Sequence, residues 1–119
     1  WGRSDVRRFA TPKVKQTGIY DVFLDLRTTR AYPYAGVSLI CEENLWPANS
    51  SRRTTFECKF VDERGHLLGT GISRFQYRYY LGERRLNAGD SLTLNISHNM
   101  KVPVIEGITD VGIELKINR

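Results

Sequence analysis

The sequence predicts an all-β domain, an antiparallel β-sandwich of about seven strands with a jelly-roll or immunoglobulin-like arrangement. Apolar residues recur at every second position in successive segments, which is the pattern of strands with one buried and one solvated face. Turn-forming residues separate these segments at short intervals, and none has the apolar spacing of a helix of useful length. The 119 residues suffice for one modest hydrophobic core, so we expect a single sandwich domain.

Each expected strand is marked by its alternating apolar positions. The last segment, residues 111–117, is the clearest, because charged or small residues occupy every intervening position. A segment of this kind places all its apolar side chains on one face of a sheet. The inward positions, in chain order, are Tyr20, Val22, Leu24 and Leu26; Val37, Leu39 and Cys41; Phe56, Cys58 and Phe60; Phe75, Tyr77 and Tyr79; Leu92, Leu94 and Ile96; and Val111, Ile113, Leu115 and Ile117.

Turn chemistry marks the breaks between the strands. Residues 62–65 read Asp-Glu-Arg-Gly, a tight turn in which Gly65 supplies the left-handed conformation. Residues 46–51 form a polar loop between two strands, and residues 81–83 and 87–90 flank another break. Short strands at this spacing favour a sandwich or jelly roll.

Charge is distributed unevenly along the chain. Residues 1–18 carry five basic residues and one acidic residue, which accounts for +4 of the net charge of +5. The remaining residues, 19–119, are near neutral and form the expected sandwich domain. Residues 1–18 are then either a basic N-terminal arm or the first edge strand. A near-neutral body without a recognisable nucleic-acid motif argues against a nucleic-acid partner.

Two cysteines, Cys41 and Cys58, occupy inward positions of different expected strands. The alternatives are a disulfide in an oxidising compartment and two free core residues. Neither cysteine belongs to a CxxC pair or to a cluster with histidine, which argues against a zinc site. We therefore expect no metal site and no cofactor.

Catalytic groups are sparse in this sequence. The two histidines, His66 and His98, are not accompanied by a serine or paired-acid motif. His98 continues the inward positions of its strand, so we expect a core or capping residue there. Gly69-Thr70-Gly71 is too short for a nucleotide-binding loop and fits a bulge or a close strand contact. The sequence thus predicts no catalytic residues and a protein that is not an enzyme; a small hydrolase centred on either histidine is the weakest alternative.

A binding surface has better support. Aromatic and arginine side chains favour protein interfaces, and both types occur in residues 27–34, with a further aromatic at Trp46. One alternative is that Tyr32 and Tyr34 plug one end of the sandwich. Another is a carbohydrate-binding domain in which Trp46, Tyr32 and Tyr34 are stacking platforms. The candidate surface residues are Arg27, Arg30, Tyr32, Pro33, Tyr34 and Trp46.

Three blocks of the sequence resemble one known family. The first reads Arg-Thr-Thr-Arg-Ala-Tyr-Pro-Tyr at residues 27–34, and the second, residues 62–71, follows the pattern D-x-x-G-x-x-x-G-x-G. The third is His-Asn-Met-Lys at residues 98–101, followed by Gly-Ile-Thr-Asp-Val-Gly-Ile at residues 107–113. In order and spacing these blocks resemble the gliding-motility-associated lipoprotein (GldH) family of Bacteroidetes. The motif residues of the second and third blocks, which we expect to be structural, are Gly65, Gly69, Gly71, His98, Met100, Gly107, Asp110 and Gly112.

The resemblance implies a lipid-anchored protein of the cell envelope, on the periplasmic face of the outer membrane or at the cell surface. Its lipidated cysteine would lie upstream of Trp1, so residues 1–18 would tether the domain to the membrane. The family implies an assembly or scaffold component of gliding machinery that binds another envelope protein and has no catalytic residues. The chain departs from the family after the Tyr-Pro-Tyr turn, where residues 35–37 are Ala-Gly-Val instead of an expected Asn-Leu.

Overall fold

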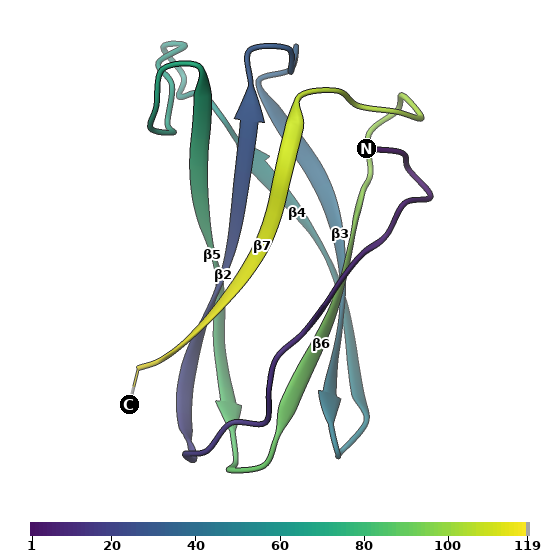
Figure 1. The fold of residues 1–119 in the computed structure, drawn as a ribbon, viewed down its shortest axis with the longest axis vertical. Helices are drawn as coiled ribbons and strands as arrows, with labels where there is room; N and C mark the ends of the chain where they lie inside the picture. The colour runs from purple at the N-terminus through teal and green to yellow at the C-terminus, as the bar shows by residue number, and fades with distance from the viewer. Residues whose placement is uncertain (119) are drawn as a thin grey trace.

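The computed structural model describes residues 1–118, which form a sandwich of two antiparallel β-sheets (Figure 1). The four-stranded sheet has the order β1-β6-β3-β4, and the three-stranded sheet has the order β5-β2-β7. The all-β sandwich predicted from the sequence is therefore confirmed. The strands are β1 (Arg7–Ala10), β2 (Gly18–Thr29), β3 (Gly36–Trp46), β4 (Ser50–Lys59), β5 (Arg74–Leu86), β6 (Ser91–His98) and β7 (Ile108–Ile117).

The strand order follows a nested pairing. β1 pairs with β6, β2 pairs with β5, and β3 pairs with β4, as in a long hairpin that has been rolled up. This is the wrapping of a jelly roll, to which β7 adds as a further strand beside β2. The immunoglobulin order, which places the first, second, fifth and fourth strands in one sheet, is not observed.

The core lies between the two sheets and uses the alternating positions that the sequence predicts. β2 and β6 show this most completely, because every second side chain is buried and the intervening ones are partly exposed. Val22, Leu39 and Leu94 are fully buried in this layer. Burying such a side chain completely stabilises a fold by about 1.5–3 kcal/mol relative to leaving it exposed.

One ion pair crosses the interior and joins the two sheets. Glu43 occupies an inward position of β3, and its carboxylate accepts two hydrogen bonds from the Arg84 guanidinium of β5, at 2.6 and 3.0 Å. Both side chains are nearly enclosed. The neighbouring Glu42 points to the opposite face and pairs with Arg53 at 3.0 Å. The two adjacent glutamates thus serve different faces of the strand, as strand geometry requires.

The break expected between residues 81–83 and 87–90 is present only at residues 87–90, where the chain turns from β5 to β6; the interruption expected at residues 81–83 is wrong. β5 continues through this segment to Leu86. Gly82 adopts a φ of +115° at a β-bulge, where the register with β2 shifts between Val22 and Phe23. A glycine within an apolar run marks either a turn or a bulge, and here the long partner strand β2 imposes the bulge.

The structure contradicts a disulfide between Cys41 and Cys58, because both thiols are free and buried. In the pairing of β3 with β4, Cys58 lies opposite Val37 and Cys41 lies opposite Thr54, so the cysteines are offset by four residues. That offset corresponds to about 13 Å, whereas bridged Cα atoms lie within about 7 Å of each other. Burial raises the pKa of Cys41 to about 11 and the pKa of Cys58 to about 12.

The basic N-terminal segment, residues 1–18, lies on the sandwich. β1 pairs with β6 as an edge strand of the four-stranded sheet. Before β1, the Ile105 N–H donates a hydrogen bond to the Trp1 carbonyl at 3.0 Å. After β1, the Val14 N–H donates to the Asp90 carbonyl at 2.8 Å. The segment is therefore an edge of the sheet and not a free arm.

Candidate functional site

One end of the sandwich, which we call the loop end, collects the three sequence blocks. It consists of the connections at residues 30–35, 60–73 and 99–107, together with residues 1–6 (Figure 1). The N-terminus lies at this end, and the last described residues lie near the opposite end. Blocks that are far apart in the sequence thus meet in the fold.

Gly107 joins the third block to the first. Its φ is +95°, and its carbonyl accepts a hydrogen bond from the Thr29 N–H at 2.7 Å. A Cβ at Gly107 would lie 2.3 Å from the Tyr32 backbone nitrogen, so only glycine fits this contact. Tyr32 itself is buried; its hydroxyl donates to the Gly36 carbonyl at 2.6 Å, and its ring contacts Phe60 edge-on. Tyr32 therefore closes the core and is not a surface residue, which corrects its assignment to the binding surface.

The glycines of the second block shape the connection at residues 60–73. Gly69 packs against the Tyr77 ring, where a Cβ would lie 2.6 Å from the ring edge. At Gly71, which has a φ of +126°, a Cβ would lie 1.9 Å from the Arg74 carbonyl oxygen. The predicted tight turn is present, with a hydrogen bond from the Gly65 N–H to the carbonyl at residue 62. These glycines hold the loop close to the sheet.

The two arginines of the first block are used in contacts within the chain. The Arg30 guanidinium donates to the Ile72 carbonyl at 2.9 Å, which ties the first block to the residue that follows the second block. Arg27 lies on the outer face of β2 and forms an ion pair with Asp110 of β7 at 3.5 Å. Both arginines thus stabilise the positions of neighbouring segments.

His98 and Met100 anchor the third block beneath the N-terminal residues. The Met100 N–H donates to His98 Nδ1 at 3.3 Å, so Nε2 carries the ring proton. The His98 ring is buried under the Trp1 indole, at 5.7 Å between ring centres. The Met100 sulfur accepts a hydrogen bond from the Ser38 N–H of β3 at 3.4 Å. Burial lowers the pKa of His98, and the nearby Arg3 guanidinium adds to that effect, so the neutral form of the ring is favoured in the folded protein.

The other histidine belongs to the exposed turn of the second block. His66 Nδ1 lies 3.2 Å from an Asp62 carboxylate oxygen, while the other Asp62 oxygen accepts hydrogen bonds from the backbone N–H groups of Arg64 and His66. Asp62 is thus engaged in shaping the turn. His66 projects into solvent, and His98 is enclosed beneath Trp1, so neither position resembles the cleft that a hydrolase requires.

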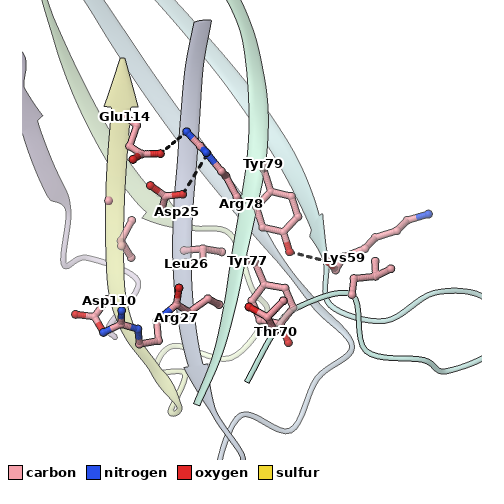
Figure 2. Close-up of a pocket in the computed structure, with 14 residues that line it drawn as sticks. Asp25, Leu26, Arg27, Lys59, Thr70, Tyr77, Arg78, Tyr79, Asp110 and Glu114 are labelled. Atoms are coloured by element: carbon pink, nitrogen blue, oxygen red, sulfur yellow. Dashed lines mark hydrogen bonds and ion pairs between the residues drawn. The ribbon is translucent and has the colours of Figure 1, made fainter. Parts of the chain in front are cut away.

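A shallow depression of about 820 Å³ borders β2, β5 and β7 below the loop end (Figure 2). Arg78 lies across it, paired with Glu114 at 2.5 Å and with Asp25 at 3.8 Å, and its guanidinium lies 4.0 Å from the centre of the Phe23 ring. Burial and the neighbouring Glu114 raise the pKa of Asp25. Gly112, which faces Asp25, leaves the floor of the depression open. The lining as a whole carries as many basic as acidic side chains, namely Arg27, Lys59 and Arg78 against Asp25, Asp110 and Glu114, so the depression is a polar surface whose formal charges balance.

The predicted binding residues do not form one surface. Trp46 ends β3, ten residues beyond Gly36, and about 33 Å therefore separates it from the loop end. Its indole N–H donates to the Thr93 hydroxyl at 3.0 Å. Since Tyr32 is buried and Trp46 lies at the opposite end, the three-aromatic carbohydrate platform is not present. Pro33 and Tyr34 remain exposed at the loop end.

Exposed apolar side chains are concentrated at the loop end, and the sequence analysis named only Tyr34 among them. Ile72 is 81% exposed and Leu68 is 55% exposed. Of the ten large apolar side chains exposed within residues 1–118, seven lie at this end. For Leu67, Leu68 and Ile72 the signal in the sequence is a large apolar residue beside the glycines of the second block. The seven are Val6, Tyr34, Leu67, Leu68, Ile72, Val102 and Val104.

Comparison with known proteins gives the family. A family model described as GldH lipoprotein matches residues 1–115. The chain belongs to the GldH lipoprotein family. The resemblance inferred from the three sequence blocks is thereby confirmed.

Relatives of this GldH-family chain carry the same description. It is 25% identical over 123 residues to the gliding motility lipoprotein GldH of Flavobacterium johnsoniae, covering 98% of this chain and 77% of the relative. It is 23% identical over 125 residues to the GldH homolog of Christiangramia forsetii, covering 98% and 76%. Among solved structures, Eiger TNF from S. frugiperda is 14% identical with a TM-score of 0.38, covering 90% of this chain and 63% of that one. That TM-score is too low to indicate a common fold.

Membership of the GldH family makes this a gliding-motility lipoprotein. A lipoprotein is held at a membrane by its lipid, which indicates a lipid-anchored position at the cell envelope. Within residues 1–118 no helix is long and apolar enough to cross a membrane.

Proposed function

We propose that this GldH-family protein is a non-catalytic assembly component of the gliding machinery, which binds another envelope protein through its loop end. The domain would act on the periplasmic face of the outer membrane or at the cell surface. The observation that carries this proposal is the concentration of exposed apolar side chains at the loop end, whereas the rest of the described surface has few of them. Concentrated exposed apolar residues are typical of protein-binding surfaces.

The apolar side chains are presented by a stiffened backbone. The carbonyl of Ile72 accepts a hydrogen bond from the Arg30 guanidinium. The preceding residue, Gly71, packs closely against the start of β5. Leu68 is held by the hydrogen bond that its N–H donates to the Phe60 carbonyl at 2.9 Å. A surface that is already ordered loses little conformational entropy on binding, which favours affinity.

The test replaces the two most prominent loop residues. A Leu68→Ser, Ile72→Ser double variant, expressed in the native host with its own lipid anchor, should lose the envelope proteins that co-purify with the wild type and should lose gliding. Burying two such side chains contributes about 3–6 kcal/mol, so binding should weaken by at least a hundredfold. Tyr80→Ser is the matched control, because Tyr80 is 56% exposed but lies in the middle of β5.

Normal folding of each variant is checked by thermal unfolding. If the folded double variant retains the same partners and gliding, the loop end is not the binding surface. If the Tyr80→Ser control loses the partners equally, the effect is not specific to the loop end and the proposal fails.

A further inference from the structure

The side of the sandwich between β1 and β7 is open. β7 has β2 as its neighbour on one side only, so it is an edge strand of ten residues. Its C-terminal continuation bonds to β2 through the Asn118 N–H, which donates to the Ile19 carbonyl at 2.7 Å. Because bonding directions alternate along a strand, the backbone groups of Val111, Ile113 and Leu115 point away from β2. No residue within the described range 1–118 pairs with these groups, so they are available as donors and acceptors for another strand.

The inward side chains of β7 are incompletely covered. Ile113 and Leu115 lie opposite Leu24 and Val22 of β2, which are fully buried, yet both are only partly buried themselves. Ile117 is 45% exposed. The core is therefore left uncovered along the edge that β7 presents to β1.

A groove of about 800 Å³ follows this opening. Residues 6–9 face residues 108–111 at one end of this opening, and residues 9–16 face the remainder of β7 along the groove. The groove between them is mainly apolar and is bordered by residues 9–16 on one side and by β7 on the other. The segment of β7 from Val111 to Ile117 is about 23 Å long, which suits an extended strand of about seven residues.

The rim of the groove is basic. Lys13 and Lys15 are exposed on it, and neither has an ion-pair partner within residues 1–118. Its lining contains no acidic side chain among the described residues. Nearer the N-terminus, Arg7 is paired with Asp5 at 3.3 Å. An occupant that carries carboxylates beside Lys13 and Lys15 would complement this rim.

We propose that β7 and this groove accept an extended segment of a partner protein, which adds to the three-stranded sheet as a fourth strand. The segment has apolar residues at every second position, to cover Ile113 and Leu115, and acidic residues next to Lys13 and Lys15. The outward backbone groups of β7 favour an extended polypeptide over lipid as the occupant, because only a polypeptide can pair with them along the whole strand. A second copy of this chain would bring two sets of the same lysines together, which disfavours pairing of β7 with itself.

This site is separate from the loop end, and it rests on the proposed function only in that both require a protein partner. The probes are two synthetic peptides with the same alternating valine and threonine core, one ending in aspartates and the other in lysines. The acidic peptide should bind the folded chain and slow amide hydrogen exchange at Ile113 and Leu115. A Lys13→Glu, Lys15→Glu variant should bind it at least tenfold more weakly, and these exposed positions leave folding intact.

A backbone variant distinguishes strand addition from simple charge attraction. Ile113→Pro removes one outward N–H without removing a bond to β2, and it should abolish binding, whereas the Ile113→Val control should bind normally. Equal binding of the acidic and basic peptides, or failure of the acidic peptide to protect the β7 amides, overturns the proposal. Without peptide, the β7 amides could also become protected from hydrogen exchange as the protein concentration rises. That result would assign the edge to a second copy of the chain and would also overturn the proposal. The Leu68→Ser, Ile72→Ser variant distinguishes the two proposals. If it loses gliding but still binds the acidic peptide, the loop end and the β7 groove are separate sites.

Discussion

At the scale of single residues, the motif glycines act through the contacts that a side chain would disturb. Gly107 and Gly89 share a φ of +95°, so the intrinsic conformational cost of a substitution is the same at both. Nothing lies within 4 Å of a Cβ built at Gly89, whereas one at Gly107 meets the backbone of Tyr32. Comparing substitutions at these two glycines therefore distinguishes the cost of backbone strain from the cost of a steric clash.

Gly107→Ala should therefore destabilise the fold much more than Gly89→Ala. The left-handed conformation alone costs an alanine about 1–2 kcal/mol, and displacing Tyr32 adds the cost of overpacking, about 1–3 kcal/mol. We expect a loss of about 2–5 kcal/mol for Gly107→Ala and about 1–2 kcal/mol for Gly89→Ala, measured by urea unfolding. Equal losses would show that Gly107 is required for its dihedral angle alone.

At the scale of secondary-structure elements, the contact between β3 and β5 depends on the ion pair of Glu43 and Arg84. It is bidentate and nearly enclosed, so its two hydrogen bonds fix how one sheet lies over the other. The desolvation of both charges offsets much of their attraction. The pair is therefore expected to matter most when one partner is removed.

A double-mutant cycle tests this expectation. Glu43→Leu or Arg84→Met alone leaves one enclosed charge without its partner and should lower the free energy of unfolding by about 3–5 kcal/mol. The double variant should recover most of that loss, because an apolar pair of similar volume replaces the charged one. The exposed pair of Glu42 and Arg53 is the control, and breaking it should cost at most about 1 kcal/mol. Additive losses in the enclosed pair would show that the two side chains do not interact.

At the scale of the whole molecule, the N-terminal residues and the third block close over His98 and complete one end of the sandwich. Trp1 covers the ring, the backbone of Trp1 and Pro103 lies beside it, and Nε2 has no hydrogen-bond partner within residues 1–118. An imidazolium at this position would be enclosed and close to Arg3. Protonation of His98 therefore opposes folding.

The stability of the whole domain should therefore depend on pH through His98. Above the ordinary histidine pKa of about 6.5 the ring is neutral in both states and contributes nothing. Because the folded pKa lies lower, the unfolded chain binds more protons as the pH falls below about 6.5, and stability drops by up to about 1.4 kcal/mol per pH unit until the folded pKa is reached. His98→Gln should reduce the dependence of the unfolding free energy on pH below about 6.5. Urea unfolding at several pH values measures this dependence.

Much of the architecture follows from local sequence pattern. The inward positions of β2 and β6 are evident from alternation alone, because the side-chain period of a strand is independent of its neighbours. For the same reason, the adjacent Glu42 and Glu43 side chains can be assigned to opposite faces of their strand from the sequence. The turn at Gly65 and the burial of His98 likewise follow from local chemistry and strand phase. The family resemblance also rests on local blocks.

The sequence by itself therefore determined the family to which the chain belongs and the buried face of the six segments with alternating apolar residues, but not that of β1. Only the tertiary structure decided that Tyr32 closes the core while Leu68 and Ile72 are exposed, and that Gly82 makes a bulge. It also placed Cys41 and Cys58 out of reach of each other. The physical reason is the same in each case, because exposure, register and distance depend on segments that are remote in the chain, and no local pattern contains them.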